Sequence, residues 1–462
     1  MSAPARSGQV LAIACAGIVL ASLDLFIVNV ALPDIAQDFG DANLGNLSWI
    51  LNGYAIVYAA LLVLCGRLAE RYPRNISFLA GIALFTVASA ACALANSIGT
   101  LVAFRLLQAA GAALLTPTSL GLILATFPAE RRGGAVRTWA AIGGFAAALG
   151  PVVGGLLVTA SWRWIFLVNV PIGLLGLLVG WIKLPQVPGH NVPIPRFWAA
   201  ALITVGISAL TFGIVKLNDW GWNSSGVLLS LVTAVATLAL FVAHCMRSDN
   251  PFIDPALFRI RDFTRATLTM APFSTAFGGL LLSLVLWEEG VWHWSAMKIG
   301  LAIAPGPFMV PVTSLLLAGR LIARFGVTMV VTAGLVVFAA GVIVWAVLAG
   351  PHPDLVFAVL CVIPSGIGVG LTLPTLMGLG TSALPASSFS TGSGVINMIR
   401  QIGFAVGVAV FVAIVGSPGS VEGQMAAFRI AWWVMAATTA LGLMPLLLLM
   451  RRRHAVTAAE PA

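Results

Sequence analysis

Residues 66–73 read GRLAERYP, and residues 319–326 read GRLIARFG. Glycine, arginine, leucine, a second arginine and an aromatic residue recur at the same offsets in the two segments. A short charged sequence that is written twice in an apolar chain indicates an internal repeat. The number of hydrophobic segments between the two copies therefore bears on how the repeated halves are arranged.

The composition is that of a membrane protein. Of the 462 residues, 60% are hydrophobic and 8% are charged, whereas soluble domains carry about 25% charged residues. The net charge is +9. Basic residues collect in the cytoplasmic loops of membrane proteins, so this charge predicts a lipid bilayer and no nucleic acid as partner. The five cysteines have no paired spacing, which predicts neither a disulfide framework nor a metal site.

Long apolar runs predict transmembrane helices, each of which needs about twenty apolar residues. The predicted fold class is therefore an all-α polytopic membrane protein with fourteen transmembrane helices. The runs cover residues 9–32, 47–65, 76–95, 99–124, 136–159, 163–183, 197–217, 226–246, 265–287, 297–318, 327–348, 355–379, 390–415 and 430–450.

The repeated segment divides these spans into two bundles. Its first copy follows the second span and its second copy follows the tenth, so the copies are eight spans apart. Two six-helix bundles in tandem would place them six apart, and two inserted helices account for the difference. We therefore predict an N-terminal bundle at 1–184, two additional helices with cytoplasmic linkers at 185–263, a C-terminal bundle at 264–450 and a basic cytoplasmic tail at 451–462.

The basic residues also predict the orientation. If the N-terminus lies inside, most of the 24 lysines and arginines fall in cytoplasmic segments, as the positive-inside rule requires. An even number of spans then places both termini on the cytoplasmic side. We expect a multi-pass protein of the plasma, or inner, membrane.

Six motifs occur in order along the chain. The first span contains LDLFIVNVALPDI, the loop after the second span is GRLAERYPRN, and the fourth span contains RLLQAAGAALLTP. The fifth span contains ALGPVVGG, the sixth begins with WRWIFLVNVPIG, and the thirteenth contains RQIGFAVGVAV. In these motifs the chain resembles the major facilitator superfamily over nearly its whole length. More narrowly, it resembles the fourteen-helix drug:proton antiporter family of the EmrB/QacA type.

The resemblance implies a secondary active transporter with a major facilitator fold and a binding site near midplane, between the two bundles. It would export amphipathic drugs or antibiotics in exchange for protons by alternating access. The implied partners are a small-molecule substrate, protons and the bilayer, with a periplasmic adaptor protein as an optional one. We expect a monomer, no cofactor, no metal and no enzymatic activity.

The two copies of the repeated segment are the predicted gate. The family motif usually has Asp where this chain has Glu70, and Gly where it has Pro73, which cannot adopt a positive φ. Ala323 stands in the second copy where Glu70 stands in the first. Pairs between Arg and Glu would bridge helix ends on the cytoplasmic face while the transporter is open outward. The gating residues are Gly66, Arg67, Glu70, Arg71, Arg74, Gly319, Arg320 and Arg324.

Asp24 is the only acidic residue within a predicted span, which makes it a functional candidate. At about 1.5 Å per residue it lies roughly 12 Å from the outer end of the first helix, and Arg105 lies roughly 9 Å from the same face. We expect the two charges to interact in some states of the cycle. Either they form a proton-coupling pair that helix movements separate, or they are a permanent strut between the first and fourth helices.

Further polar residues within the spans are candidates for substrate binding. Arg400 has no acid at its depth in the C-terminal spans, so we expect it to face the cavity unless carbonyls of the twelfth span neutralise it. Glu288, in LWEEGVWHW, either guides protons or cationic substrate at the outer mouth or lies in an ordinary solvated loop. The candidates are Asn29, Tyr54, Tyr58, Gln108, Trp287, Glu288, Asn397, Arg400 and Gln401.

The fifth span carries the antiporter motif Gly150, Pro151, Gly154 and Gly155. Small residues let helices approach closely, and proline kinks a helix. The resemblance implies that this motif seals one face of the cavity.

The sequence lacks the motif by which many transporters hydrolyse a nucleotide. None of the lysines lies in a Gly-Lys-Ser/Thr P-loop, so the energy comes from an ion gradient, a partner or the substrate gradient. The alternatives to an exporter are a proton-coupled symporter or facilitator for a small metabolite and, in another class, a membrane sensor without transport. Arg105 and Arg400 against Asp24 give the spans an excess of positive charge, which favours neutral, zwitterionic or anionic substrates.

Overall fold

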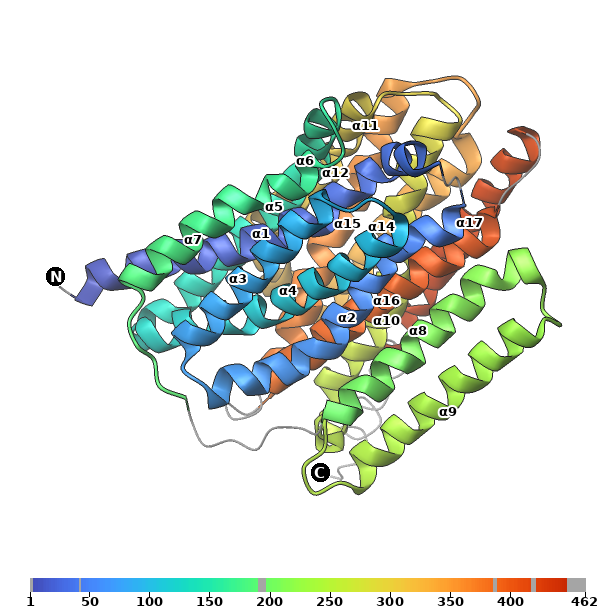
Figure 1. Cartoon of the computed structure of the whole chain (residues 1–462). Helices are drawn as coiled ribbons and strands as arrows, with labels where there is room; N and C mark the ends of the chain where they lie inside the picture. Colours follow the sequence, from blue (N-terminus) through green and yellow to red (C-terminus); the bar gives the residue numbers. More distant parts are fainter. Residues whose placement is uncertain (1–2, 41–42, 190–196, 385–388, 417–420, 447–462) are drawn as a thin grey trace.

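The computed structural model describes residues 3–40, 43–189, 197–384, 389–416 and 421–446. These residues form a bundle of long helices (Figure 1). Fourteen helical segments among them are long and apolar enough to cross a membrane, and these described residues form no strand. The fourteen predicted spans are thereby confirmed. The predicted tail at 451–462 and residues 190–196 of the first linker lie outside the described residues.

The helices follow the predicted order. The N-terminal part comprises α1 (Ala3–Phe39), α2 (Leu44–Arg71), α3 (Arg74–Ala93), α4 (Ile98–Thr126), α5 (Ala129–Val158), α6 (Trp164–Leu167) and α7 (Asn169–Lys183). The middle part comprises α8 (Phe197–Trp220), α9 (Ser225–Arg247) and the 3₁₀ helix η1 (Pro255–Arg259). The C-terminal part comprises α10 (Arg261–Gly290), α11 (Ala296–Ile303), α12 (Pro305–Thr313), the π-helical turn η2 (Ser314–Ala318), α13 (Gly319–Phe325), α14 (Val327–Leu348), α15 (Leu355–Ser382), α16 (Phe389–Val415) and α17 (Val421–Leu441).

Two of the fourteen spans are broken into shorter pieces. The sixth span is made of α6 and α7, and the tenth is made of α11, α12, η2 and α13. Pro305 and Pro311 explain part of the second interruption, because proline removes a backbone donor and disturbs the preceding turn. The π-helical turn η2 is a further interruption of the tenth span, and such turns are frequent at functional sites.

The two halves of the chain pack in the same way. In the N-terminal half α1 packs on α4 and α5, α3 packs on α4, and α7 packs on α3. In the C-terminal half α10 packs on α15 and α16, α14 packs on α15, and α17 packs on α14. The halves meet along two seams, α2 against α16 and α5 against α11 and α12. This arrangement confirms the two six-helix bundles, whereas the exact domain boundaries stay a prediction.

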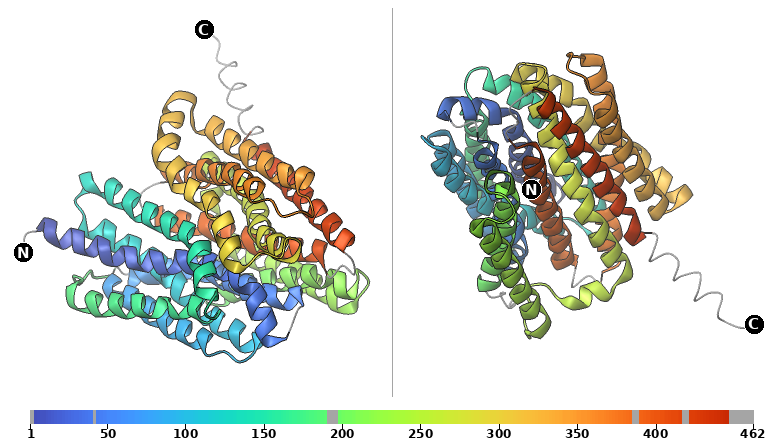
Figure 2. Two further views of the ribbon diagram at one scale, coloured as in Figure 1. Left: turned by 90° about the horizontal axis from the view of Figure 1, so that it is seen from above. Right: turned by 90° about the vertical axis from the view of Figure 1, so that its right-hand side faces the viewer.

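The inserted pair lies on one flank of the molecule (Figures 1 and 2). α8 packs against both α2 and α16, so it covers one of the two seams, and α9 packs against α8. Trp49 of α2 and Phe212 of α8 lie 6.3 Å apart between ring centroids. The insertion therefore contacts both bundles through α8.

The two ends of the molecule differ in charge and in packing. We call the end that carries the two Gly-Arg-Leu segments the basic end, and the opposite end the acidic end. At the acidic end the bundles are in contact, since a Cβ on Gly155 of α5 would lie 2.6 Å from the carbonyl oxygen of Ala296 on α11. At the basic end, a Cβ on Gly66 or Gly319 would meet no atom within 4 Å, and α13 has no buried residue. The bundles are therefore in contact at the acidic end, whereas the second Gly-Arg-Leu segment is exposed at the basic end.

Several helices are longer than the sequence predicted, and two of them, α1 and α10, extend further at the acidic end. α1 continues through Pro33 to Phe39, and α10 continues to Gly290. The prediction that Asp24 is the only acid within a span is therefore wrong, because four other acids lie in the last turns of these helices. The predicted excess of one positive charge holds only for the middle of the spans. The four acids are Asp34, Asp38, Glu288 and Glu289.

Candidate functional site

Asp24 lies buried inside the N-terminal bundle and accepts hydrogen bonds from three side chains. Its Oδ2 accepts a 2.5 Å hydrogen bond from Nη1 of Arg105, which also donates to Oε1 of Gln108 at 2.6 Å. Its Oδ1 accepts from Nε2 of Gln108 at 2.8 Å and from Nδ2 of Asn169 at 3.2 Å. The structure thus brings Asp24 and Arg105 together as expected, and it places Gln108 where it holds both charged groups.

Ser89 and Asn169 complete this network, and sequence reasoning did not single them out. The Ser89 hydroxyl on α3 accepts from Gln108 at 2.9 Å and from Asn169 at 3.0 Å, and it donates to the carbonyl of Phe166 at 3.1 Å. Both side chains are fully buried. Asn169 could have been found, because it is a polar residue in the apolar run of the sixth span and needs a partner in lipid. Ser89 carries no such signal in its surroundings.

Helix α2 closes the network on the side of Arg105. The Nε of Arg105 donates to the carbonyl of Ile50 at 3.3 Å. Its guanidinium carbon lies 4.1 Å from the ring centroid of Tyr54 and 5.8 Å from that of Phe166, which adds cation–π attraction. Tyr54 is 1% exposed. This predicted substrate candidate therefore packs on the ion pair instead of facing open space.

The ion pair is compensated on every side in this conformation. Burying a charge is unfavourable unless it is paired and hydrogen-bonded. Here the carboxylate and the guanidinium neutralise one another, and neutral donors and acceptors occupy the remaining positions. Removing one partner of such a pair typically destabilises a protein by about 3–5 kcal/mol. The geometry fits both a coupling pair and a strut, and the choice between them stays a prediction.

The antiporter motif packs α5 onto α1 directly beside Asp24. A Cβ on Gly150 would lie 2.7 Å from Cβ of Phe26, and one on Gly154 would lie 2.9 Å from the carbonyl oxygen of Ile27. Phe26 and Ile27 follow Asp24 by less than one helical turn. The two glycines are therefore required by the close approach of the two helices.

The same motif also reaches the other bundle. Gly155 lies against the backbone of Ala296 and Met297 on α11, and the carbonyl of Pro151 lies against Gly300. The motif consequently contacts α1 on one side and the C-terminal bundle on the other. A movement of α11 at the acidic end would be passed through α5 to the part of α1 that carries Asp24.

Arg400 of α16 lies beside α2, near the middle of its helix. It lies near Tyr58, whose hydroxyl forms a 2.9 Å hydrogen bond with Oγ1 of Thr116. The Nε of Arg400 is buried without a partner. Among the described residues no hydrogen bond joins Arg400 to a carbonyl of α15. This position between the bundles favours the cavity-facing interpretation of Arg400 over neutralisation by the twelfth span.

Four other candidates are placed less favourably for substrate binding. Asn29 and Asn397 donate to carbonyls of their own helices, Leu25 at 3.2 Å and Ser393 at 3.1 Å. Gln401 is 2% exposed. Trp287 packs inside the C-terminal bundle, 5.4 Å from Phe428 and 5.1 Å from Trp432 between ring centroids. Trp287 thus belongs to an aromatic core.

Glu288 is buried. It is 1% exposed, and its Oε2 has no hydrogen-bond partner. The interpretation of this residue as part of a solvated loop is therefore wrong. Its neighbour Glu289 is only partly buried.

The two gating segments differ in backbone conformation. Pro73 has φ −54° and precedes α3, whereas Gly326 in the second copy has φ +82°. Only glycine adopts that positive φ without strain, so the departure of the first copy from the family pattern has a structural effect. None of the four ion pairs among the described side chains includes Glu70.

The first gating segment also holds the start of the linker between the bundles. The backbone N–H of Arg74 donates to the carbonyl of Val187 at 3.0 Å, and the N–H of Val187 donates to Oδ1 of Asn75 at 3.4 Å. The linker thus leaves the N-terminal bundle along the loop between α2 and α3.

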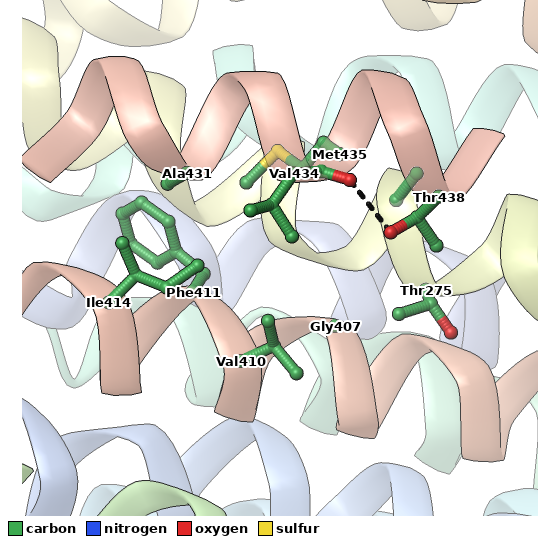
Figure 3. A pocket seen from close by; sticks show the side chains of 10 residues that line it. Thr275, Gly407, Val410, Phe411, Ile414, Ala431, Val434, Met435 and Thr438 are labelled. Atoms are coloured by element: carbon green, nitrogen blue, oxygen red, sulfur yellow. Dashed lines mark hydrogen bonds between the residues drawn. The ribbon is translucent and has the colours of Figure 1, made fainter. Parts of the chain in front are cut away.

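A pocket between α10, α16 and α17 contains none of the predicted site residues (Figure 3). Its two hydroxyl groups are used within their own helices, since Thr438 donates to Val434 at 2.7 Å and Thr275 donates to Ala271 at 3.0 Å. The pocket therefore presents an apolar surface. Its lining residues are Thr275, Ala276, Gly407, Val410, Phe411, Ile414, Ala431, Val434, Met435 and Thr438.

Comparison with known proteins gives one family and a consistent group of relatives. The family model described as Major Facilitator Superfamily matches residues 14–408 and 292–462. The chain is 33% identical to the methylenomycin A resistance protein of Streptomyces coelicolor, over 98% of this chain and 95% of the relative. It is 32% identical to the multidrug resistance protein Stp of Mycobacterium tuberculosis, over 85% and 73% of the two chains. It is 30% identical to the tetracenomycin C resistance and export protein of Streptomyces glaucescens, over 87% and 74%.

Solved structures show the same fold at low sequence identity. A peptide transporter POT in complex with sulfate has a TM-score of 0.70 at 17% identity and covers 98% of both chains. A second solved structure, which concerns substrate recognition in proton-dependent oligopeptide transporters, has a TM-score of 0.68 at 14% identity. At these identities the likeness concerns the fold alone.

Proposed function

The chain belongs to the major facilitator superfamily, and we propose that it exports amphipathic drugs or antibiotics in exchange for protons by alternating access. The observation that carries the proposal is the buried Asp24–Arg105 pair, joined through the antiporter motif to the contact between the bundles. Relatives named as resistance and export proteins support export as the direction. Family membership already excludes an enzyme.

The Asp24 network supplies the coupling step of this proposal. With the acidic end closed, Asp24 is held by Arg105, Gln108 and Asn169. These donors come from α4 and α7, whereas Asp24 is on α1, so a relative movement of α1 removes donors from the carboxylate. A carboxylate that loses its partners in a low-dielectric site favours its neutral form. Asp24 would then take a proton, and restoring the network would release it.

The antiporter motif couples this step to the gate. Gly150 and Gly154 contact α1 beside Asp24, while Gly155 contacts α11 of the other bundle. Opening the acidic end separates α11 from α5, which frees α5 and α1 to move together. Protonation and the opening of the gate thus depend on the same helix contacts.

We further propose that the basic end faces the cytoplasm, in keeping with the positive-inside rule. We propose in addition that the present structure, in which the bundles are in contact at the acidic end, represents the inward-open state. The arginines of the repeated segment, which are Arg67, Arg71, Arg74, Arg320 and Arg324, would all lie on the cytoplasmic side.

Arg400 supports substrates that are neutral, zwitterionic or anionic. Arg105 is neutralised by Asp24, so Arg400 is the uncompensated charge at mid-depth among the described residues. An unpaired arginine at this depth favours a water-filled or anionic environment. Resistance of a pump-deficient strain to an anionic drug, compared with resistance to ethidium, tests this assignment. Strong ethidium resistance alone would contradict it.

Transport by purified protein in proteoliposomes tests the proposed exchange. A pH gradient should drive substrate in the direction opposite to protons, and Asp24→Asn should abolish this response while the protein stays folded. Asp38→Asn is a matched control on the same helix, since Asp38 is partly exposed and pairs with Arg163. If Asp24→Asn responded to the pH gradient as the wild type does, Asp24 would have no coupling role. The Asp24–Arg105 pair would then be a permanent strut between α1 and α4. Movement of substrate in the same direction as protons would indicate the symporter, and failure to move any solute would favour a sensor.

A further inference from the structure

Glu288 is a buried acid that the Asp24 cycle does not use. It lies in the last turn of α10, is 1% exposed, and has an Oε2 atom without a hydrogen-bond partner. Burying an ionised carboxylate without a partner is strongly unfavourable. The carboxyl group of Glu288 is nevertheless shielded from water when the acidic end is closed, and this favours its neutral form.

The position of Glu288 around α10 places it on the face whose Phe277 reaches α1 of the other bundle. Glu288 follows Phe277 by eleven residues, about three helical turns, so the two share a face. The ring of Phe277 lies 6.4 Å from that of Phe26 on α1. Leu281 and Leu284 continue this face and are buried. Glu288 therefore ends an apolar seam between the two bundles, at the acidic end.

The nearest charged groups across this seam are acidic. Glu289 interacts electrostatically with Asp34 of α1 and with His293. The elements packed against this end of α10 present few basic groups: Lys298 of α11 has its ammonium 4.2 Å from the ring centroid of Trp294, and Arg429 of α17 donates to the carbonyl of Ala349. The remaining titratable groups near this end are Asp38 of α1, His352 and Asp354 between α14 and α15, and Glu422 of α17. At the acidic end Glu289 of one bundle thus lies near Asp34 of the other, and among the described residues no basic side chain forms an ion pair with Glu288.

We propose that Glu288 is a proton-binding site that permits the acidic end to close. In the open state water reaches the carboxylate, and a proton from that side binds one of its oxygens. The neutral group then enters the apolar seam without bringing an unpaired charge into it. Reopening returns the proton to the same side. The proposal rests on the proposed exchange of substrate for protons. Glu288 would be a second proton-binding residue besides Asp24, and its protons would come from the acidic side.

The sign of the pH effect follows from this assignment. The closed state binds one proton more than the open state, so a higher pH favours opening at the acidic end. One proton of difference changes the ratio of open to closed molecules by about tenfold per pH unit. Replacing Glu288 by glutamine fixes the neutral form, so the acidic end should stay closed at every pH tested.

The experiment measures the opening directly, without substrate. Spin labels are attached to Gln37→Cys and Ser295→Cys, two exposed positions on α1 and before α11, and their distance distribution is recorded in nanodiscs over a pH series. In otherwise wild-type protein the longer distance should gain population as pH rises. In Glu288→Gln the short distance should persist, and in Glu288→Asp the response should return. Glu289→Gln is the matched control, since Glu289 is partly exposed, and it should keep the response.

Infrared difference spectroscopy supplies a readout that a purely structural role would not produce. The band of a protonated carboxyl should appear in the closed state and be missing in Glu288→Gln. A wild-type pH response in Glu288→Gln, or loss of the response in Glu289→Gln alone, would overturn the proposal. A shift of the distances by Na⁺ at constant pH, without the carboxyl band, would show a metal-cation site in its place. Neither readout needs transport, so Asp24→Asn can disprove the exchange while this result stands.

Discussion

The rings of Tyr54 and Tyr58 stack on α2 with their centroids 6.0 Å apart and an angle of 10° between their planes. Tyr54 lies over the guanidinium of Arg105, and Tyr58 lies near Arg400 of the other bundle. The pair therefore connects the buried ion pair of the N-terminal bundle with the unpaired arginine of the C-terminal bundle. This connection crosses the seam between α2 and α16, where the bundles also pack.

We expect Tyr54→Leu to weaken proton coupling and Tyr54→Phe to preserve it. Phenylalanine retains the ring that attracts the guanidinium, whereas leucine removes a contact worth about 1–2 kcal/mol when desolvated. The number of protons exchanged per substrate should fall in Tyr54→Leu by a measurable fraction in proteoliposomes. Tyr58→Phe serves as the control, because it keeps the stack and loses only the hydrogen bond to Thr116. Equal coupling in Tyr54→Leu and wild type would show that the tyrosine pair is packing alone.

Gly155→Ala should shift the molecule away from the state that is closed at the acidic end. The added Cβ would come 2.6 Å from the carbonyl oxygen of Ala296, so the closed contact between α5 and α11 becomes strained. Strain of about 1–3 kcal/mol, as overpacking typically causes, changes the ratio of the two states by roughly 5-fold to more than 100-fold. Labelling of a cysteine introduced at the acidic end should accelerate accordingly.

Two matched glycines distinguish a shift of state from simple damage. Gly154→Ala strains a contact with Ile27 inside one bundle, so it should lower the unfolding temperature without accelerating labelling. Gly99→Ala meets no atom within 4 Å and should change neither quantity. Faster labelling in all three variants would mean that the effect is not specific to the inter-bundle contact.

Asn169→Ala should destabilise the protein and disturb the Asp24 network. The amide of Asn169 donates to Asp24 and to Ser89, and leaving a buried polar group unsatisfied costs about 1–3 kcal/mol. We expect a lower unfolding temperature in detergent, together with a changed pH dependence of transport. Asn397→Ala is the control, since Asn397 bonds only to the carbonyl of Ser393 in its own helix. A changed stability with an unchanged pH dependence would place Asn169 in a purely structural role.

The sequence predicted the large-scale order of the fold because the membrane imposes it. Twenty apolar residues per span and the eight-span offset of the repeat were sufficient for the two bundles and the inserted pair. The depth argument likewise brought Asp24 and Arg105 together. Both results depend on the position of residues along a helix, and this position can be counted directly from the sequence.

The sequence was insufficient where the environment of a side chain decides its role. Trp287 lies in an aromatic core and Glu288 at a buried seam, although they are neighbours in one motif and differ by only one position around α10. Ser89 joins the network because α3 packs on α4, and no local sequence pattern predicts this contact. The extensions of α1 and α10 were missed because acidic residues and Pro33 suggested helix ends, whereas contacts with neighbouring helices sustain both helices beyond them.

The repeated segment predicts an asymmetric gate at the basic end. Only the first copy carries an acid, Glu70, and Ala323 occupies its place in the second copy. In the present structure Glu70 takes part in none of the ion pairs of the described residues. Its carboxylate is therefore free to form a bridge when the basic end closes, and the bridge would stabilise the state that is open at the acidic end.

Glu70→Gln should consequently favour the state that is open at the basic end. Loss of an ion pair near the surface is worth about 0–1 kcal/mol, so we expect up to about a fivefold slower labelling of a cysteine at the acidic end. Ala323→Glu should act in the opposite direction, because it gives the second copy a carboxylate beside Arg320 and Arg324. High salt should reduce both effects, since it screens exposed charges. If Glu70→Gln and Ala323→Glu changed labelling in the same direction, the first copy would not be the acidic half of the gate.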